Sequence, residues 1–321
     1  MPSTLRPFDW RDLPLLRRYR HQSVCLNSAQ AVTRGAALSA ADFLASITPA
    51  PEVFGRFTWV CSTETDEPPL VGQFTHVPEE TVARISFLAP ESALDSPGLP
   101  ALLEGLARSA GARGAFNLLA ETDEESVVFA PLRQAGFSIY ARQQIWELPP
   151  DGETPDPRYR WSAAGAEDDL AIQTLYQSIV PGLVQQIEPP SERHAKTLVC
   201  YREGEPIAYA DLKQGPRGVW VQPFVHPDVE DTRALLRGLL SWLPHRRERT
   251  VYFCVRTYQS WLESALNGLE ARPGPRQAVM VKRLTAGQRP LKAFSLPKLE
   301  AQGEITTPIS QMENASDKVT K

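Results

Sequence analysis

The chain has 321 residues, which is enough for about two domains of ordinary size. Apolar residues make up 42% and charged residues 22%, so the chain is neither wholly disordered nor a coiled coil. The net charge of −4 leaves no basic excess for binding nucleic acid. No apolar run approaches the roughly 18 residues of a membrane span, and the first residues lack a signal-peptide core. We therefore expect a cytoplasmic protein with reduced cysteines and no membrane or nucleic-acid partner.

The first half alternates strands and helices. A short strand at 4–8 precedes a helix capped by Asp12, and Ser39 is placed to cap a second helix at 40–47. Apolar residues recur at helical spacing over 99–110, and Gly136 is placed to end a helix at 125–135. The predicted strands that follow the first two helices are 57–63, 70–77, 82–88, 115–120 and 137–148.

The second half repeats this order. Apolar positions from Ile172 to Val180 form one helical face, and further helices are predicted at 235–243 and 259–266. The predicted strands of this half are 158–161, 197–202, 206–213, 218–225, 251–255 and 277–284.

Short sequence matches between the halves indicate a duplication. Residues 58–61 read Thr-Trp-Val-Cys and residues 197–200 read Thr-Leu-Val-Cys. A second match pairs 88–90 (Leu-Ala-Pro) with 225–227 (Val-His-Pro), and the matches occur in the same order along the chain. The sequence therefore predicts two similar domains and a partly disordered tail; the ranges are 1–148 for the first domain, 149–157 for a Pro-rich linker, 158–284 for the second domain and 285–321 for the tail.

The element order, with two motifs, resembles the GCN5-related N-acetyltransferase (GNAT) fold in tandem. The strand at 82–88 leads into Ala89-Pro90 and then a helix, where the family has V-x-P-x-x-R-x-x-G-x-G/A. Residues 132–137, Leu-Arg-Gln-Ala-Gly-Phe, are similar to the family's L-Y-x-K-x-G-F. The resemblance implies an α/β fold with a mixed sheet in each of two acyl-CoA N-acyltransferase domains.

The resemblance also implies acetyl-CoA as co-substrate. In the family, two strands separate so that one of them pairs with the pantetheine arm, and a glycine-rich loop at a helix N-terminus holds the pyrophosphate. Carried onto the first half, the strand positions are Phe87, Leu88 and Ala89, and the loop positions are Ser96 and Gly98.

Both halves depart from the family loop. Ala93 stands at the arginine position of the first half. In the second half the corresponding positions are Glu230, Arg233 and Leu235, and Glu230 with Asp231 places negative charge where a pyrophosphate would lie. We therefore expect the first half to be the cofactor site and the second to have lost it.

Three residues are candidates for acid–base chemistry, and each has a structural alternative. Glu121 follows the fifth strand and is equally suited to capping the next helix. Tyr140 is a candidate proton donor or a strand-edge aromatic, because Leu132 stands at the family tyrosine position. His226, next to Pro227, is placed at a strand end or serves a structural role. No metal-ligand spacing is present in the sequence.

Two functions remain open. The first is an acyl-CoA-dependent N-acetyltransferase that acts on a small-molecule or protein amine, with the first half as the cofactor site. The alternative is a non-catalytic acyl-CoA-binding or regulatory protein derived from an acetyltransferase, because the motif residues are degenerate in both halves. A further reading has one copy active and the other only supporting it. The oligomeric state is predicted to be monomer or homodimer.

Overall fold

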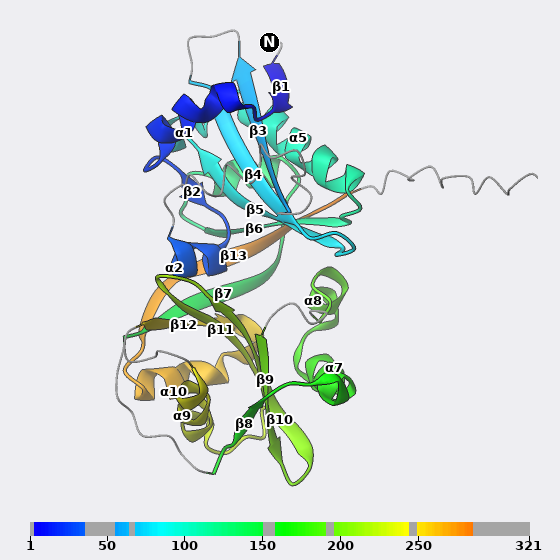
Figure 1. The fold of residues 1–321 in the computed structure, drawn as a ribbon, viewed down its shortest axis with the longest axis vertical. Coiled ribbons are helices and arrows are strands. Elements are labelled where there is room, and N and C mark those ends of the chain that lie inside the picture. The colour runs from blue at the N-terminus through cyan, green and yellow to red at the C-terminus, as the bar shows by residue number, and fades with distance from the viewer. Residues whose placement is uncertain are drawn as a thin grey trace, which may run out of the picture. The chain divides into compact units, whose positions relative to one another are not determined.

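The computed structural model describes residues 3–35, 55–63, 68–149, 158–190, 196–243 and 249–284. The helix expected at 40–47, most of the predicted linker and the tail lie outside these residues. Residues up to Gly287 form one compact unit. Within it the described strands join one mixed sheet that runs through both halves (Figure 1).

The first half contains seven strands and four helices among the described residues, together with short 3-10 turns. Its elements are β1 (Ser3–Pro7), α1 (Leu13–Tyr19), β2 (Val24–Cys25), α2 (Ser28–Arg34), β3 (Arg56–Thr63), β4 (Leu70–His76), β5 (Val82–Ala89), α5 (Leu99–Ala112), β6 (Asn117–Asp123), α6 (Phe129–Gln134) and β7 (Ser138–Leu148).

The second half follows the same order without a counterpart of β2 among the described residues. Its elements are β8 (Trp161–Ala163), α7 (Asp169–Ile179), α8 (Gly182–Ile187), β9 (Lys196–Arg202), β10 (Glu205–Gln214), β11 (Gly218–Val225), α9 (Thr232–Trp242), β12 (Thr250–Arg256), α10 (Trp261–Gly268) and β13 (Arg272–Arg283).

The two halves exchange their last strands. The sheet order is β1-β3-β4-β5-β6-β13-β7-β12-β11-β10-β9-β8. β13, the last strand of the second half, pairs antiparallel with β6 of the first half, and β7 pairs antiparallel with β12 of the second. β7 and β13 also pair with each other and close the exchange. Neither half therefore completes its sheet from its own residues.

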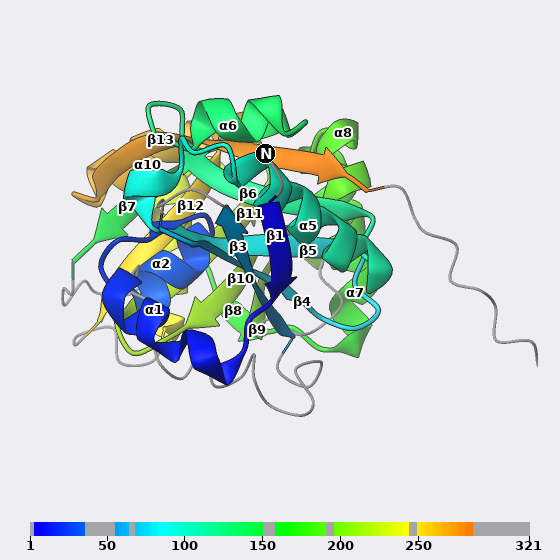
Figure 2. The same cartoon turned by 90° about the horizontal axis from the view of Figure 1, so that it is seen from above.

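Apolar side chains form cores on both faces of the sheet. In the first half, Leu102 and Leu106 of α5 pack with β4 and β5 on one face, while Leu16 and Tyr19 of α1 cover the other. Figure 2 shows where these two helices lie beside the strands. In the second half, α9 and α10 cover one face and α7 and α8 the opposite one. All these helices bury an apolar stripe, which is the main source of stability for helices of this length.

The short helices α2 and α8 each pack on the sheet of the other half. Ala29 of α2 lies against Trp220 of β11 and Cys254 of β12. In return, Ile187 of α8 packs against Leu119 of β6 and against β13. This second exchange brings side chains from both halves together beside α8.

The predicted α/β class with a mixed sheet is confirmed. The short elements β2 and α8 were not predicted individually, and the helix expected from residue 125 begins at Phe129. Gly136 ends that segment with a φ of +87°, which explains the glycine at this position. The boundaries predicted for the two domains stay a prediction, because the sheet continues from β7 into β12 and β13.

Candidate functional site

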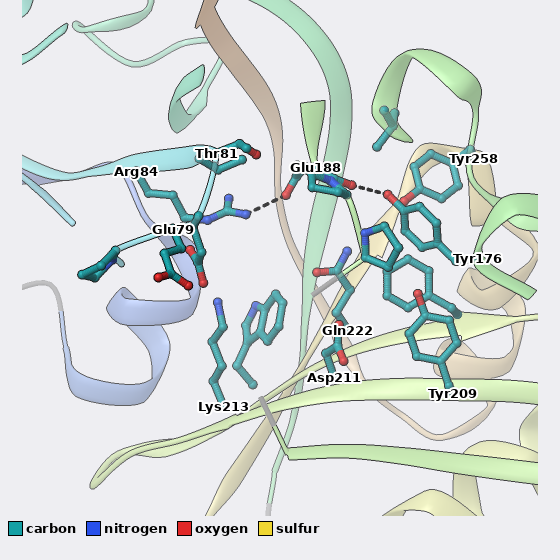
Figure 3. Close-up of a pocket in the computed structure, with 18 residues that line it drawn as sticks. Glu79, Thr81, Arg84, Tyr176, Glu188, Tyr209, Asp211, Lys213, Gln222 and Tyr258 are labelled. Carbon is teal, nitrogen blue, oxygen red and sulfur yellow. Dashed lines mark hydrogen bonds and ion pairs between the residues drawn. The ribbon is translucent and has the colours of Figure 1, made fainter. Parts of the chain in front are cut away.

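A cavity of about 280 Å³ opens between the β4–β5 turn of the first half and the α7–α8 face of the second (Figure 3). The floor consists of alternate residues of β10 and β11, which point to this face because strand side chains alternate. Its lining is Pro78, Glu79, Glu80, Thr81, Val82, Arg84, Tyr176, Val184, Glu188, Pro189, Pro190, Tyr209, Asp211, Lys213, Trp220, Gln222, Phe224 and Tyr258.

A buried ion cluster joins the two halves at the cavity wall. Glu188, just after α8, accepts from Nη2 of Arg84 at 2.9 Å through one carboxylate oxygen and from Nη2 of Arg256 at 2.9 Å through the other. Tyr140 of β7 donates its hydroxyl to the second oxygen. The side chain of Glu188 is 15% exposed and that of Arg256 only 3%. The cluster therefore holds charges that water reaches poorly.

Electrostatics in this cluster favour a charged glutamate. Desolvation alone would raise the pKa of Glu188, but the guanidinium groups of Arg256 and Arg84 outweigh it and lower that pKa to about 2. For Tyr140, desolvation and the charge of Glu188 raise the pKa well above its ordinary value. Tyr140 is therefore a neutral donor to a carboxylate.

An aromatic wall forms the opposite end of the cavity. The ring of Tyr209 stacks on that of Phe224, with centroids 4.4 Å apart and planes 9° from parallel. Tyr176 tilts against Phe224 at 5.7 Å, and Tyr258 lines the same end. Tyr209 is 3% exposed, and its hydroxyl has no hydrogen-bond partner among the described residues. This end suits a flat or apolar group.

The middle of the floor carries two opposite charges on one strand. Asp211 and Lys213 are alternate residues of β10 and both side chains rise into the cavity (Figure 3). Asp211 accepts from the Thr197 hydroxyl at 2.8 Å. The ammonium of Lys213 lies 5.1 Å from the ring centroid of Trp220. Neither charge has an ion-pair partner among the described residues.

The structure brings together two of the three predicted acid–base residues. The Glu121 carboxylate lies 3.9 Å from Nη1 of Arg84, which also binds Glu188, and Glu188 accepts from Tyr140. His226 is not connected to this cluster; its Nδ1 lies 3.7 Å from the Asp228 carboxylate on the loop after β11.

Glu121 also has a structural task. Its Oε2 accepts from the N–H of Ser28 at the start of α2, at 2.8 Å, and from the amide of Gln143 at 3.1 Å. The helix it caps is α2, which lies far from it in sequence, rather than the following helix that the sequence suggested. Oε2 of Glu121 is therefore already hydrogen-bonded within the protein.

The predicted cofactor strand of the first half is already paired. β5 and β6 pair only through residues 82–84 and then separate. β2 lies in the gap, where residues Val24–Cys25 pair antiparallel with Phe87–Leu88. Phe87 is 3% exposed, and Leu88 and Ala89 are fully buried. The free edge of β5 that a pantetheine arm would need is therefore covered by the chain itself.

Leu26 completes this closure. Its N–H donates to the carbonyl of Ser86 at 2.9 Å, and its carbonyl accepts from the N–H of Glu121 at 2.9 Å. Ser86 is an extra residue in β5, since the pairing with β4 passes from Phe87 directly to Ile85. Such a bulge leaves a backbone carbonyl without a partner on the neighbouring strand. Here that carbonyl, of Ser86, accepts the hydrogen bond from the N–H of Leu26.

The loop residues Ser96 and Gly98 lie where the resemblance places them, at the start of α5. The N–H of Ser96 is bonded to the Ala93 carbonyl at 3.1 Å. Gly98 faces inward, because a Cβ there would lie 3.1 Å from Cγ2 of Thr63. This glycine is explained by its close approach to β3, and no side chain caps α5.

The second half closes its corresponding gap with a side chain. β11 and β12 pair in parallel from Gly218 to Val221 and then separate. The buried Gln259 accepts from the Val225 N–H at 3.0 Å and donates to the Pro223 carbonyl at 2.9 Å. At the helix beyond, Asp231 caps α9 by accepting from the Ala234 N–H at 3.0 Å.

Acetyl-CoA therefore does not fit either gap as the structure stands. In both halves the strand edge is hydrogen-bonded by the chain, and in the second half a carboxylate also takes the helix N-terminus.

Sequence reasoning missed the charged residues at the wall and floor of the cavity. Arg84, Glu188 and Arg256 come from separate segments, and nothing local marks them as partners. One signal was available, because Asp211 and Lys213 alternate with apolar residues in a strand, which places charges on one face. Among the described residues no cluster of three metal-binding side chains occurs, and no helix there is long and apolar enough to cross a bilayer.

Comparison with solved structures identifies the fold. A tandem GNAT protein from the clavulanic acid biosynthesis pathway aligns over 88% of this chain and 98% of its own, with 14% identity and a TM-score of 0.51. A GCN5-related N-acetyltransferase from Sphaerobacter thermophilus aligns over 88% and 95%, with 13% identity and a TM-score of 0.52. No family model matches the sequence, and comparison with curated proteins finds no significant match.

The chain thus has the tandem GNAT acetyltransferase fold that its sequence resembles. At these sequence identities the likeness shows the fold alone, because one fold can carry many activities.

Proposed function

We propose that this protein is a non-catalytic member of the acetyltransferase fold that binds a small ligand in the cavity between its halves. The observation that carries this proposal is the position of Leu26, whose backbone bridges β5 and β6 where pantetheine would pair. The cavity, in contrast, is open and lined by charged and aromatic groups.

Energetics support this reading. Entry of a pantetheine arm into the first half would break both backbone bonds of Leu26 and the pairing of β2 with β5. Each bond is worth about 1 kcal/mol net, and an orphaned buried group costs more. A cofactor would have to replace every one of these bonds.

The acid–base residues support the same conclusion. Direct acetyl transfer needs a base for the ammonium of the acceptor and a donor for the leaving thiolate. Glu121 is held by Ser28 and Gln143, and Tyr140 donates to Glu188. Both side chains are therefore held by other residues of the protein.

A calorimetric titration of the full chain with acetyl-CoA tests the proposal. At about 1 mM ligand, any complex with a binding free energy beyond roughly −4 kcal/mol gives a signal. We expect none. Saturable binding that Ser96→Asp abolishes, and that the matched exposed control Ser138→Asp retains, would overturn the proposal and place a cofactor at the first half.

Two observations favour acyl-CoA-dependent N-acetyl transfer as the second candidate. β5 keeps a bulge at Ser86, and the first turn of α5 has no side-chain cap. In that case residues 24–26 would leave the gap when the cofactor binds, and a small-molecule or protein amine would be the acceptor. Faster hydrogen exchange at Leu26 in the presence of acetyl-CoA would support this candidate. A cytoplasmic location and a monomeric or homodimeric state remain predictions.

A further inference from the structure

Asp211 and Lys213 form an unneutralised pair of charges inside the cavity. As alternate residues of β10 their Cα atoms lie about 6.6 Å apart on the same face of the sheet. Their ionic groups do not pair with each other or with another described residue. Asp211 is held by Thr197 through only one of its oxygens, at 2.8 Å.

Both charges lose hydration in this setting. Desolvation raises the pKa of Asp211, against the hydrogen bond from Thr197 and the charge of Lys213. Desolvation lowers the pKa of Lys213, and the positive charge of Arg84 lowers it further. Two partly desolvated groups of opposite sign are best stabilised by a ligand that carries both opposite charges.

The cavity has a distinct apolar end beyond these charges. Tyr209 and Phe224 stack there, and Tyr176 closes against Phe224. Lys213 points away from this end, toward Arg84 and Glu79, whereas Asp211 lies between Lys213 and the tyrosines (Figure 3). A volume of about 280 Å³ lies near the lower limit for small-molecule sites and accommodates a ligand of amino-acid size.

We propose that the cavity binds a free amino acid with an aromatic side chain, in its zwitterionic form. Its carboxylate would bind Lys213, its ammonium Asp211, and its ring would lie against Tyr209 and Phe224. The inference rests on the proposed ligand-binding function and names the chemical class of that ligand. A simple amine or a simple carboxylate would leave one of the two protein charges without a partner.

The test is a calorimetric titration of the full chain with three probes that share a phenyl group. L-Phenylalanine carries both charges, 3-phenylpropionate only the carboxylate and phenethylamine only the ammonium. We expect one equivalent of phenylalanine to bind at least about tenfold more tightly than either analogue, which is about 1.4 kcal/mol. Glycine, which lacks the ring, should bind more weakly than phenylalanine by a similar factor.

Variants assign each charge. Lys213→Met should weaken the binding of phenylalanine and 3-phenylpropionate about tenfold or more and leave that of phenethylamine unchanged, since it removes the charged donor to the carboxylate. Asp211→Asn should weaken the binding of phenylalanine and phenethylamine and leave that of 3-phenylpropionate unchanged. Lys213→Arg, which keeps the positive charge, should retain binding of all three probes. The matched controls Lys282→Met and Asp228→Asn, which lie outside the cavity lining, should change nothing. Thermal unfolding of each variant reports whether it folds.

Three results would overturn the inference: no binding of phenylalanine, equal binding of an analogue that lacks one charge, or unchanged phenylalanine binding in both cavity variants. Its failure is separable from that of the proposed function. Acetyl-CoA binding would overturn the non-catalytic role, while the probe series would still decide whether an amino acid occupies the cavity.

Discussion

Glu188 lies between two guanidinium groups, and each of its carboxylate oxygens accepts from one of them. Such an arrangement stabilises the fold only while all partners are present. Removal of the carboxylate would leave the like charges of the half-buried Arg84 and the buried Arg256 without their shared partner. Two nitrogens of Arg256 already lack a hydrogen-bond partner among the described residues. The cluster is therefore more sensitive to substitution than the exposed ion pairs are.

We expect Glu188→Gln to lower the free energy of unfolding by about 3–5 kcal/mol, because breaking a buried ion pair strands the remaining charges. Urea unfolding at neutral pH measures this change in the free energy of unfolding. Glu124→Gln is the control, since the Glu124–Arg142 pair has side chains 41% and 52% exposed and should contribute less than about 1 kcal/mol. Equal effects of the two substitutions would contradict the description of the cluster.

The same residue predicts an acid response. The pKa of Glu188 falls from 4.5 to about 2 on folding, so its stabilising contribution is complete above pH 4.5 and is lost as the pH falls from there toward 2. The stability difference between the wild type and Glu188→Gln should therefore shrink across that interval. A difference that is constant with pH would argue against a charged Glu188.

At the scale of elements, a buried amide replaces a strand in the second half. Gln259 is fully buried and satisfies the N–H of Val225 and the carbonyl of Pro223. In the first half the backbone groups of β2 and Leu26 make the hydrogen bonds that fill the corresponding gap. The two halves thus close corresponding gaps by different means.

We expect Gln259→Leu to destabilise the protein by about 2–4 kcal/mol, because it orphans one buried donor and one buried acceptor in β11. Chemical denaturation measures the loss. Gln186→Leu, on the exposed face of α8, is the control and should stay within about 0.5 kcal/mol of the wild type. A neutral Gln259→Leu would mean that another group satisfies β11.

The sequence was informative about elements and their order, and less so about partners. Alternation and helical spacing predicted the strands and helices of both halves because these are local properties. β2 spans two residues and α8 six, which is too short for a periodic signal. The cavity could not be predicted, because Arg84 belongs to the first half, Asp211 and Glu188 belong to the second, and they meet only in the folded chain.

At the scale of the whole molecule, β13 lies between β6 and β7 and pairs with both. We expect a chain that ends at residue 271, before β13, to fail to unfold cooperatively. In such a chain β6 loses its pairing with β13, and β7 loses one of its two neighbouring strands. A chain that ends at residue 287 should behave as the full-length protein does. Folding of the shorter chain would contradict the pairing.

The full chain should also give a single calorimetric transition with equal calorimetric and van't Hoff enthalpies, although it contains a duplication. Independent domains would give two transitions. The exchange of β7 and β13 couples the two cores, so that neither can open without breaking the edge of the other.

This exchange also bears on how such a chain could arise. A single unfused copy with the same strand exchange would complete its sheet only by associating with a second molecule around a two-fold axis. Fusion of the two copies turns that association into an intramolecular event, so that pairing no longer depends on protein concentration. Once the copies are connected covalently they are free to diverge, so that each can close its own gap by different means while a cavity forms between them.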